Sequence, residues 1–395
     1  MKNTIHFCKA VGFFVFLFLA IVLTSCDQEP LFWDIAHEYP PISPDVYGSP
    51  SKIVELGSSL YVTNAVGVWK YDPVFPFWVP MVDNDTPSFV AKDLAVAGTN
   101  LFALDRNGNI WKWNNPGWSI IYAEINTEKL FGAGTYLYTA VLTGIRGSSS
   151  GYSIRCLDIN GVVQSGRGIL NTGLLMETVY FGFNGKTYIG TLGNGLYVET
   201  AGSFAKDAFF SNETIIGMTV YNDKIFIVTP ALVYCYDGST PPGAPITGGY
   251  RFTGAIAGWT DDGTNHNLLL LGLMRTSGSF GYGYREILID TNGAALGGLR
   301  IPGEGFEIAS PLPWPIALLS SVKINSQYVS AIGKYAINYL YVMPHTFLPY
   351  ADDGETAFSA LPRPIIFAST AKDGLLSYRT RNGVPQWNGE DKTPF

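Results

Sequence analysis

The stretch Asp93–Asn115 reads DLAVAGTNLFALDRNGNIWKWNN and decides the fold class. It contains an apolar segment, a Gly-Thr-Asn turn, a second apolar segment, an Asn-Gly turn and a third segment with two tryptophans. Short apolar segments bounded by such turn residues are typical of β-strands. We therefore expect consecutive antiparallel strands at Leu94–Ala97, Leu101–Leu104 and Ile110–Trp113.

Versions of this unit recur along most of the chain. The first six begin near Ile53, Leu94, Leu130, Thr178, Ile216 and Gly254. A seventh contains strand patterns at Ile365–Ser369, Leu375–Arg379 and Val384–Trp387, and its inner strand is expected within Ser320–Met343. The starts of these first six units lie about 36 to 48 residues apart, and several short strands in such a period are typical of β-propeller blades.

The sequence thus predicts an all-β protein, a single β-propeller of about seven four-stranded blades over residues 51–395. Eight blades follow if Ser320–Met343 is a complete blade, and six if the fourth or seventh unit is degenerate. Asn-Gly and Asn-Asp pairs predict tight hairpins, because these residues tolerate positive φ. The pairs are Asn107-Gly108, Asn160-Gly161, Asn184-Gly185, Asn222-Asp223 and Asn382-Gly383.

The composition supports this fold and limits the partners. Charged residues make up 14% of the chain, aromatic residues 14% and hydrophobic residues 47%. Few charges and many aromatics suit a large all-β protein that buries aromatic strand faces, and they exclude a disordered chain. The net charge is −7, and it becomes −9 without Met1–Ser25, which holds Lys2 and Lys9. Such an acidic protein is a poor ligand for nucleic acid.

The N-terminus has the pattern of a secretory signal. Lys2 and Lys9 precede an apolar run of 14 residues, Ala10–Leu23. A run of this length suits a signal peptide better than a membrane span. The next residues, Leu23-Thr24-Ser25-Cys26, resemble the lipobox of bacterial lipoproteins. The resemblance implies lipidation of the Cys26 thiol, cleavage before this residue and acylation of the new amine. The alternative is a secreted protein with an incidental cysteine.

This resemblance implies the domain organisation and the location. Residues 1–25 are the expected signal peptide, residues 26–50 a lipidated cysteine with a Pro-rich tether, and residues 51–395 the propeller. The expected location is the cell envelope, with the chain lipid-anchored to a bacterial membrane; the choice between inner and outer membrane stays open. In the tether, Leu31–Ile35 is a candidate outermost strand beside Val384–Trp387 that would close the ring.

Two repeat segments resemble known propeller families. They are Leu60-Tyr61-Val62 with Val68–Asp72, and Gly190–Tyr197, which reads GTLGNGLY. The second is similar to the sensor-domain propellers of two-component regulators, and the repeats also resemble PQQ-like propeller repeats. A lipid anchor with a propeller is similar to the propeller lipoprotein of the outer-membrane assembly machinery. These resemblances imply the fold and single out no specific family.

The cysteines of the expected mature body are predicted to be free thiols. Cys156 and Cys235 occupy equivalent strands of the third and fifth units, with a whole unit between them. A disulfide needs Cα atoms within about 7 Å, which non-adjacent blades do not offer outside the channel.

Signals for chemistry are few. Asp261, Asp262 and Asn265 form the best candidate calcium loop, although they lack the EF-hand spacing and loop carboxylates near Gly usually stabilise turns. The chain has no G-x-S-x-G elbow for nucleophilic catalysis. A hydrolase using loop carboxylates such as Asp261, Asp262 and Glu304 is the enzymatic alternative.

Aromatic side chains are the remaining candidates for binding. Most tryptophans lie in strand patterns and are expected to pack between blades. Phe77, Trp78, Trp314 and Tyr350 lie near prolines or acidic residues and are expected to be partly exposed, which suits contact with a protein or a glycan. The sequence therefore favours a non-catalytic, membrane-anchored binding or scaffold protein. The alternatives are a propeller-type hydrolase or calcium-dependent enzyme, and an assembly factor for outer-membrane proteins.

Overall fold

The chain divides into two compact units, Met1–Ile42 and Ser43–Phe395, and the computed structural model describes residues of the second only. The described residues are 46, 48–64, 67–72, 77–81, 89–143, 151–169, 173, 175–248, 250–261, 266–274, 281–297, 335–343, 365–371, 373–381 and 384–389. All regular secondary structure among them is β-strand. Within this part of the chain, no helix is long and apolar enough to cross a membrane.

The first four sheets are antiparallel and follow the chain in order. Sheet 1 contains β1 (Val54–Leu56), β2 (Ser59–Thr63), β3 (Val68–Asp72) and β4 (Phe77–Pro80). Sheet 2 contains β5 (Ala91–Ala97), β6 (Asn100–Asp105), β7 (Asn109–Trp113) and β8 (Trp118–Ala123). Sheet 3 contains β9 (Thr127–Ala133), β10 (Tyr136–Thr143) and β11 (Gly151–Asp158). Sheet 4 contains β12 (Met176–Phe183), β13 (Lys186–Thr191), β14 (Leu196–Thr200) and β15 (Ser203–Lys206).

Three further sheets complete the series. Sheet 5 contains β16 (Gly217–Tyr221), β17 (Lys224–Val228), β18 (Leu232–Tyr236) and β19 (Thr247–Gly248). Sheet 6 contains β20 (Arg251–Asp261), β21 (His266–Met274) and β22 (Gly281–Ile289). Sheet 7 contains β23 (Ile337–Val342), β24 (Ile366–Thr370), β25 (Leu375–Arg381) and β26 (Val384–Gly389).

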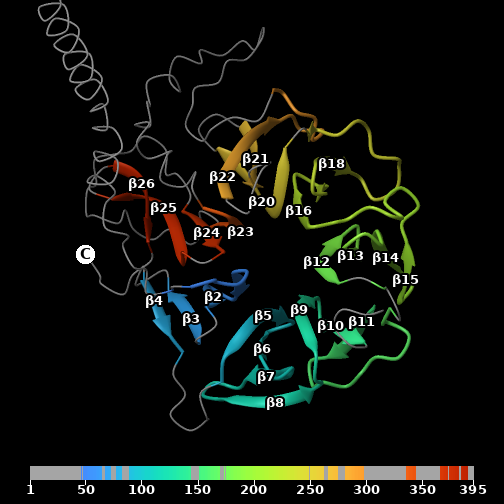
Figure 1. Cartoon of the computed structure of the whole chain (residues 1–395), viewed down its shortest axis with the longest axis vertical. Coiled ribbons are helices and arrows are strands. Elements are labelled where there is room, and N and C mark those ends of the chain that lie inside the picture. Colours follow the sequence, from blue (N-terminus) through green and yellow to red (C-terminus); the bar gives the residue numbers. More distant parts are fainter. Residues whose placement is uncertain are drawn as a thin grey trace, which may run out of the picture. The chain divides into compact units, whose positions relative to one another are not determined.

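The described residues form seven sheets arranged as a β-propeller, which is the predicted fold, although sheets 3 and 6 contain three strands there instead of four. The first strand of each sheet is innermost, and neighbouring innermost strands are in contact from β1 through β5, β9, β12, β16 and β20 to β23 (Figure 1). Sheets 7 and 1 share a core in which Phe367 packs against Tyr71 and Trp78, so the series closes on itself. The strand β23 lies in the stretch Ser320–Met343, and its pairing with β24 assigns it to the seventh blade.

Glycines let the innermost strands come close together. A Cβ atom at Gly132 in β9 would lie 1.7 Å from the carbonyl oxygen of Val96 in β5. At Gly217 in β16, a Cβ atom would lie 2.0 Å from the carbonyl oxygen of Gly254 in β20. Any larger residue at these two positions must push neighbouring blades apart.

The two ends of the sheets carry different loops. In the four-stranded sheets, one end carries the connection from the outermost strand to the next innermost strand, together with the turn between second and third strands; we call it the connection face. The turn at Gly195 and the connection at Phe210 and Glu213 illustrate this, because the amides of Gly195 and Leu196 donate to the carbonyls of Glu213 and Phe210. The opposite end carries the first-to-second and third-to-fourth turns, and we call it the turn face.

Val46 is the first described residue that packs in the propeller. Val46 is fully buried in the core shared by sheets 7 and 1. The amide of Leu375 donates to the carbonyl of Val46 at 2.9 Å, and the amide of Gly374 donates to that of Gly48 at 2.8 Å. This is the bonding pattern that Phe210 and Glu213 make with sheet 4, so the N-terminal segment fills the position of an inter-blade connection. The predicted strand Leu31–Ile35 lies outside the described residues.

Hairpins and outer strands differ in part from expectation. Both central residues have positive φ in Asn184-Gly185 and Asn222-Asp223, which confirms tight primed turns there. In Asn107-Gly108 and Asn160-Gly161 only the glycine has a positive φ. There the aspartate two residues before the asparagine accepts backbone amides of the turn and holds a wider turn. The segment after β11 forms only isolated bridges, at Val163 and Ile169, whereas the short outer strands β15 and β19 were not predicted.

Candidate functional site

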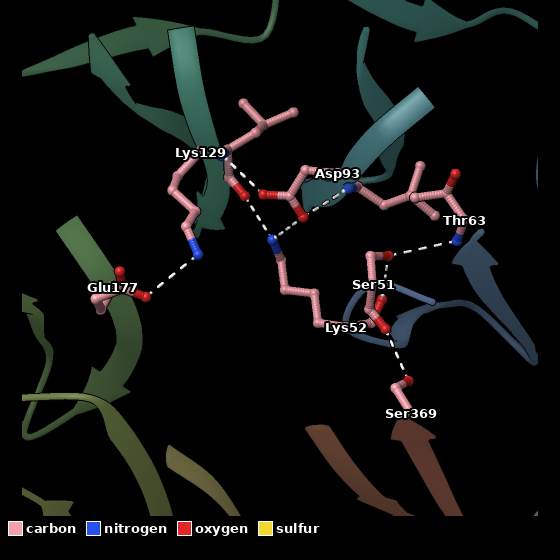
Figure 2. Close-up of polar contacts among 9 residues, drawn as sticks. Ser51, Lys52, Thr63, Asp93, Lys129, Glu177 and Ser369 are labelled. Atoms are coloured by element: carbon pink, nitrogen blue, oxygen red, sulfur yellow. Dashed lines mark hydrogen bonds and ion pairs between the residues drawn. The ribbon is translucent and has the colours of Figure 1, made fainter. Parts of the chain in front are cut away.

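A group of charged side chains lies where the innermost strands begin, at the connection-face end of the ring. We call it the entry cluster, and it contains Lys52, Asp93, Lys129 and Glu177 (Figure 2). Lys52 precedes β1, whereas the other three lie in β5, β9 and β12. Four consecutive sheets therefore contribute to it.

Lys52 joins three of these sheets. Its Nζ atom lies 2.5 Å from Oδ1 of Asp93 and donates to the carbonyl of Leu130 at 2.6 Å. The same nitrogen lies 4.1 Å from the centre of the Phe131 ring, a cation–π distance. Burial lowers the pKa of Lys52, since it disfavours the charged form, and the Asp93 carboxylate opposes this effect.

The carboxylate of Asp93 accepts further hydrogen bonds with both of its oxygens. Oδ1 also accepts the amide of Leu94 at 2.9 Å, and Oδ2 accepts the amide of Leu130 at 2.9 Å. Next to this pair, Nζ of Lys129 lies 3.2 Å from Oε2 of Glu177, and both side chains are more exposed. The buried pair is therefore an inter-blade tie, and the Lys129–Glu177 pair is its solvent-facing neighbour.

Three tyrosines lie in the innermost strands β12 and β23: Tyr180, Tyr339 and Tyr341. The hydroxyl of Tyr341 in β23 donates to Oε2 of Glu55 in β1 at 2.9 Å. Burial raises the pKa of Tyr339 to about 12, and the phenol of Tyr180 in β12 contributes to the shift.

Lys52 and Asp93 hold neighbouring blades together. A general acid or base needs an accessible group with a suitable pKa, whereas Lys52 and Asp93 are bound to one another and to the backbone. Within the described ranges, no group of three or more His, Cys, Asp and Glu residues is placed to hold a metal ion.

The structure tests few of the predicted site residues. Trp78 is completely buried, so its predicted exposure is wrong: its ring packs 5.3 Å from Tyr71 and 5.6 Å from Phe367. Phe77 begins β4, and Asp261 ends β20 opposite His266. The residues Cys26, Asp262, Asn265, Glu304, Trp314 and Tyr350 lie outside the described residues.

The predictions about packing residues are confirmed. Trp69, Trp111 and Trp118 are all at most 9% exposed and belong to cores between sheets. Cys156 in β11 and Cys235 in β18 are free thiols in third strands of separate sheets.

Two features were missed from the sequence. A threonine at the end of the second strand donates its hydroxyl across the following turn; these residues are Thr63, Thr143, Thr191, Thr229 and Thr370. Exposed apolar side chains also lie in inter-blade connections, at Ile125, Phe209 and Tyr250. The threonines could have been recognised in the sequence, because each stands at the same position of its repeat. Nothing in the sequence marked the exposed apolar residues.

Solved structures similar to this chain are β-propellers. The extracellular domain of a one component system from B. thetaiotaomicron matches 84% of the chain with a TM-score of 0.51 and 13% identity. An ancestral GH74 enzyme matches 90% with a TM-score of 0.53 and 13% identity. YCF48 from Cyanidioschyzon merolae matches 86% of the chain and 98% of its own length, with a TM-score of 0.51 and 11% identity.

At these identities the similarity establishes the fold alone. The chain spans only 38% of the B. thetaiotaomicron protein and 48% of the GH74 enzyme. No protein-family model matches the chain. No curated protein matches it either.

Proposed function

We propose that the chain is a lipid-anchored lipoprotein of the bacterial cell envelope, whose propeller is a non-catalytic binding scaffold for a protein or glycan partner. The lipobox-like Leu23–Cys26 supports the anchor. The paired state of the entry cluster supports the non-catalytic role, because Lys52 and Asp93 already bind groups of the chain itself. Propellers commonly serve unrelated functions, so the role rests on this site and not on the fold.

The anchor is tested by replacing the acylated residue. The Cys26→Ala variant should lose acyl labelling and lose the membrane attachment that depends on it. A Cys235→Ser variant is the matched control, because this thiol lies in the propeller body, and it should fractionate like the parent. Unchanged acylation and fractionation of Cys26→Ala would contradict the anchor.

The scaffold role is tested with the intact lipoprotein in its own membranes. Affinity capture should recover a protein or glycan that also binds the purified lipoprotein directly and is recovered unchanged in mass. Conversion of the captured glycan or protein by the purified chain would overturn the non-catalytic role. Absence of direct binding to every captured molecule would overturn the scaffold role.

A further inference from the structure

Three strongly exposed apolar side chains share one face of the propeller. Ile125 is 79% exposed between β8 and β9, Phe209 is 43% exposed between β15 and β16, and Tyr250 is 41% exposed between β19 and β20. Each connection runs from the outermost strand of one sheet to the innermost strand of the next. All three side chains therefore lie on the connection face.

These side chains have defined local surroundings. The Phe209 ring meets Tyr236 edge-on at 6.3 Å, and the Tyr250 ring lies 6.4 Å from Phe252. Ile125 follows the Glu124 carbonyl, which packs closely on Gly108, and it precedes Asn126 with a φ of 69°. The connections thus hold apolar groups outward on short, well-packed segments.

The N-terminal chain enters the propeller at this same face. Val46 and Gly48 are hydrogen-bonded to the start of β25 and the glycine before it, at a turn between second and third strands. About 20 residues separate Val46 from Cys26. A flexible chain of this length has an r.m.s. span of roughly 25 Å, and an extended Pro-rich one spans roughly 60 Å. A lipid on Cys26 is therefore joined to the propeller through a chain that enters at the connection face.

We propose that the connection face docks on the lipid bilayer, with Ile125, Phe209 and Tyr250 inserted into its headgroup region. This inference rests on the proposed lipid anchor and adds an orientation to it. Aliphatic and aromatic side chains partition into the headgroup boundary, and Tyr also keeps its hydroxyl in the polar layer. The mature chain has a net charge of −9, so apolar contact rather than attraction to anionic lipid drives the docking.

The orientation leaves the turn face for partners. The turn face also carries exposed apolar side chains: Val162, 58% exposed, in the turn after β11, its neighbour Val163, 46% exposed, and Phe181, 49% exposed, near the end of β12 beside Gly134. Docking of the connection face leaves these side chains on the opposite face of the propeller.

The test places a fluorophore on each face of the acylated protein. Ile125→Cys, Phe209→Cys and Tyr250→Cys are made separately in a Cys235→Ser background, with Val162→Cys as the matched control on the turn face. Cys156 is fully buried and stays unlabelled. Each labelled protein is reconstituted in phosphatidylcholine vesicles with nitroxide-labelled lipid, and again with phosphatidylglycerol added.

We expect lipid-borne nitroxide to quench the three connection-face labels at least about twofold more than the label at Val162, equally in both vesicle types. Equal quenching on both faces of protein that floats with the vesicles overturns the bilayer docking and leaves the anchor intact. Failure to float overturns the anchor and the docking together. Shielding of the three labels in native membranes but not in protein-free vesicles identifies a protein occupant and overturns the bilayer as partner.

Discussion

The Nζ atom of Lys52 lies 2.5 Å from Oδ1 of Asp93, although Lys52 precedes sheet 1 and Asp93 belongs to sheet 2. Only 16% and 10% of the two side chains are exposed, so the pair is shielded from water. The Leu130 backbone bonds to both partners and extends the tie to sheet 3. Three blades therefore depend on one ammonium group.

Removing that ammonium should destabilise the ring. We expect Lys52→Met to lower the free energy of unfolding by about 3 kcal/mol, because it leaves the Asp93 carboxylate buried without its cation. Lys129→Met is the control, since its pair with Glu177 is more exposed and contributes about 0–1 kcal/mol. Urea unfolding measures both. Equal losses in the two variants would contradict the special role of Lys52.

Close packing of innermost strands predicts a second loss. We expect Gly132→Ala to destabilise the protein by about 2 kcal/mol or more, because the new Cβ would meet the Val96 carbonyl oxygen at 1.7 Å. Gly243→Ala is the matched control, since a Cβ there has no neighbour within 4 Å. Thermal unfolding of the two variants compares them, and a parent-like melting temperature for Gly132→Ala would show that the blades can separate freely.

The seam between sheets 7 and 1 should open when its buried N-terminal residue becomes polar. Val46→Asp places a carboxylate in the core with Phe367, and we expect faster hydrogen exchange at the amides of Gly374 and Leu375. Val79→Asp changes a side chain that is 43% exposed and should leave these amides protected. Protection retained in Val46→Asp would mean that the seam closes without this segment.

Stability should fall at alkaline pH, because the buried Cys156 thiol and Tyr339 phenol are neutral in the folded protein and lose their protons there. Burial raises the pKa of the Cys156 thiol from 9.0 to about 11 and that of Tyr339 from 10.0 to about 12. Both groups stabilise the folded state fully below their ordinary pKa values, and this contribution is lost as the pH rises towards the raised values. Lys52 has the opposite effect on stability. Because its pKa is lowered from 10.5 in the folded protein, its burial reduces stability at lower pH, and this penalty disappears as the pH rises towards 10.5.

Variants separate these contributions. The loss of unfolding free energy between pH 9 and 11 should be smaller in Cys156→Ala by at most about 1.4 kcal/mol per pH unit. Tyr339→Phe should reduce the loss between pH 10 and 12, whereas Tyr250→Phe, at an exposed position, should leave it unchanged. Urea titrations across this range measure the slopes, and identical slopes in all four proteins would refute the assignment.

The repeating pattern of the sequence was sufficient for the blades but not for their edges. The strands from Leu94 to Trp113 were predictable because each turn residue and each apolar run is local. The outer strands β15 and β19 show little apolar pattern in the sequence. The side chains of β15 are mostly exposed, and β19 is only two residues long, so neither contributes much to the core. The inner strand of sheet 7 could be confined only to a stretch, because its partner β24 follows a long insertion.

The binding candidates failed for a related reason. Trp78 lies among prolines and was expected to be exposed, but its burial depends on Phe367, a residue near the other end of the chain. The entry cluster was also invisible to local patterns, because Lys52 and Asp93 become neighbours only when two sheets pack. Contacts that close the ring are long-range, and a repeat pattern does not encode which blade meets which.

The position of Val46 has a consequence for how the chain is threaded. Since Val46 and Gly48 bind sheet 7 as Phe210 and Glu213 bind sheet 4, the joint between the last and first blades is equivalent to an internal one. The ring accordingly has no structurally privileged starting point. A circular permutant that links Gly389 to Val46 by a short loop, and opens the chain at another inter-blade connection, should retain the same propeller fold.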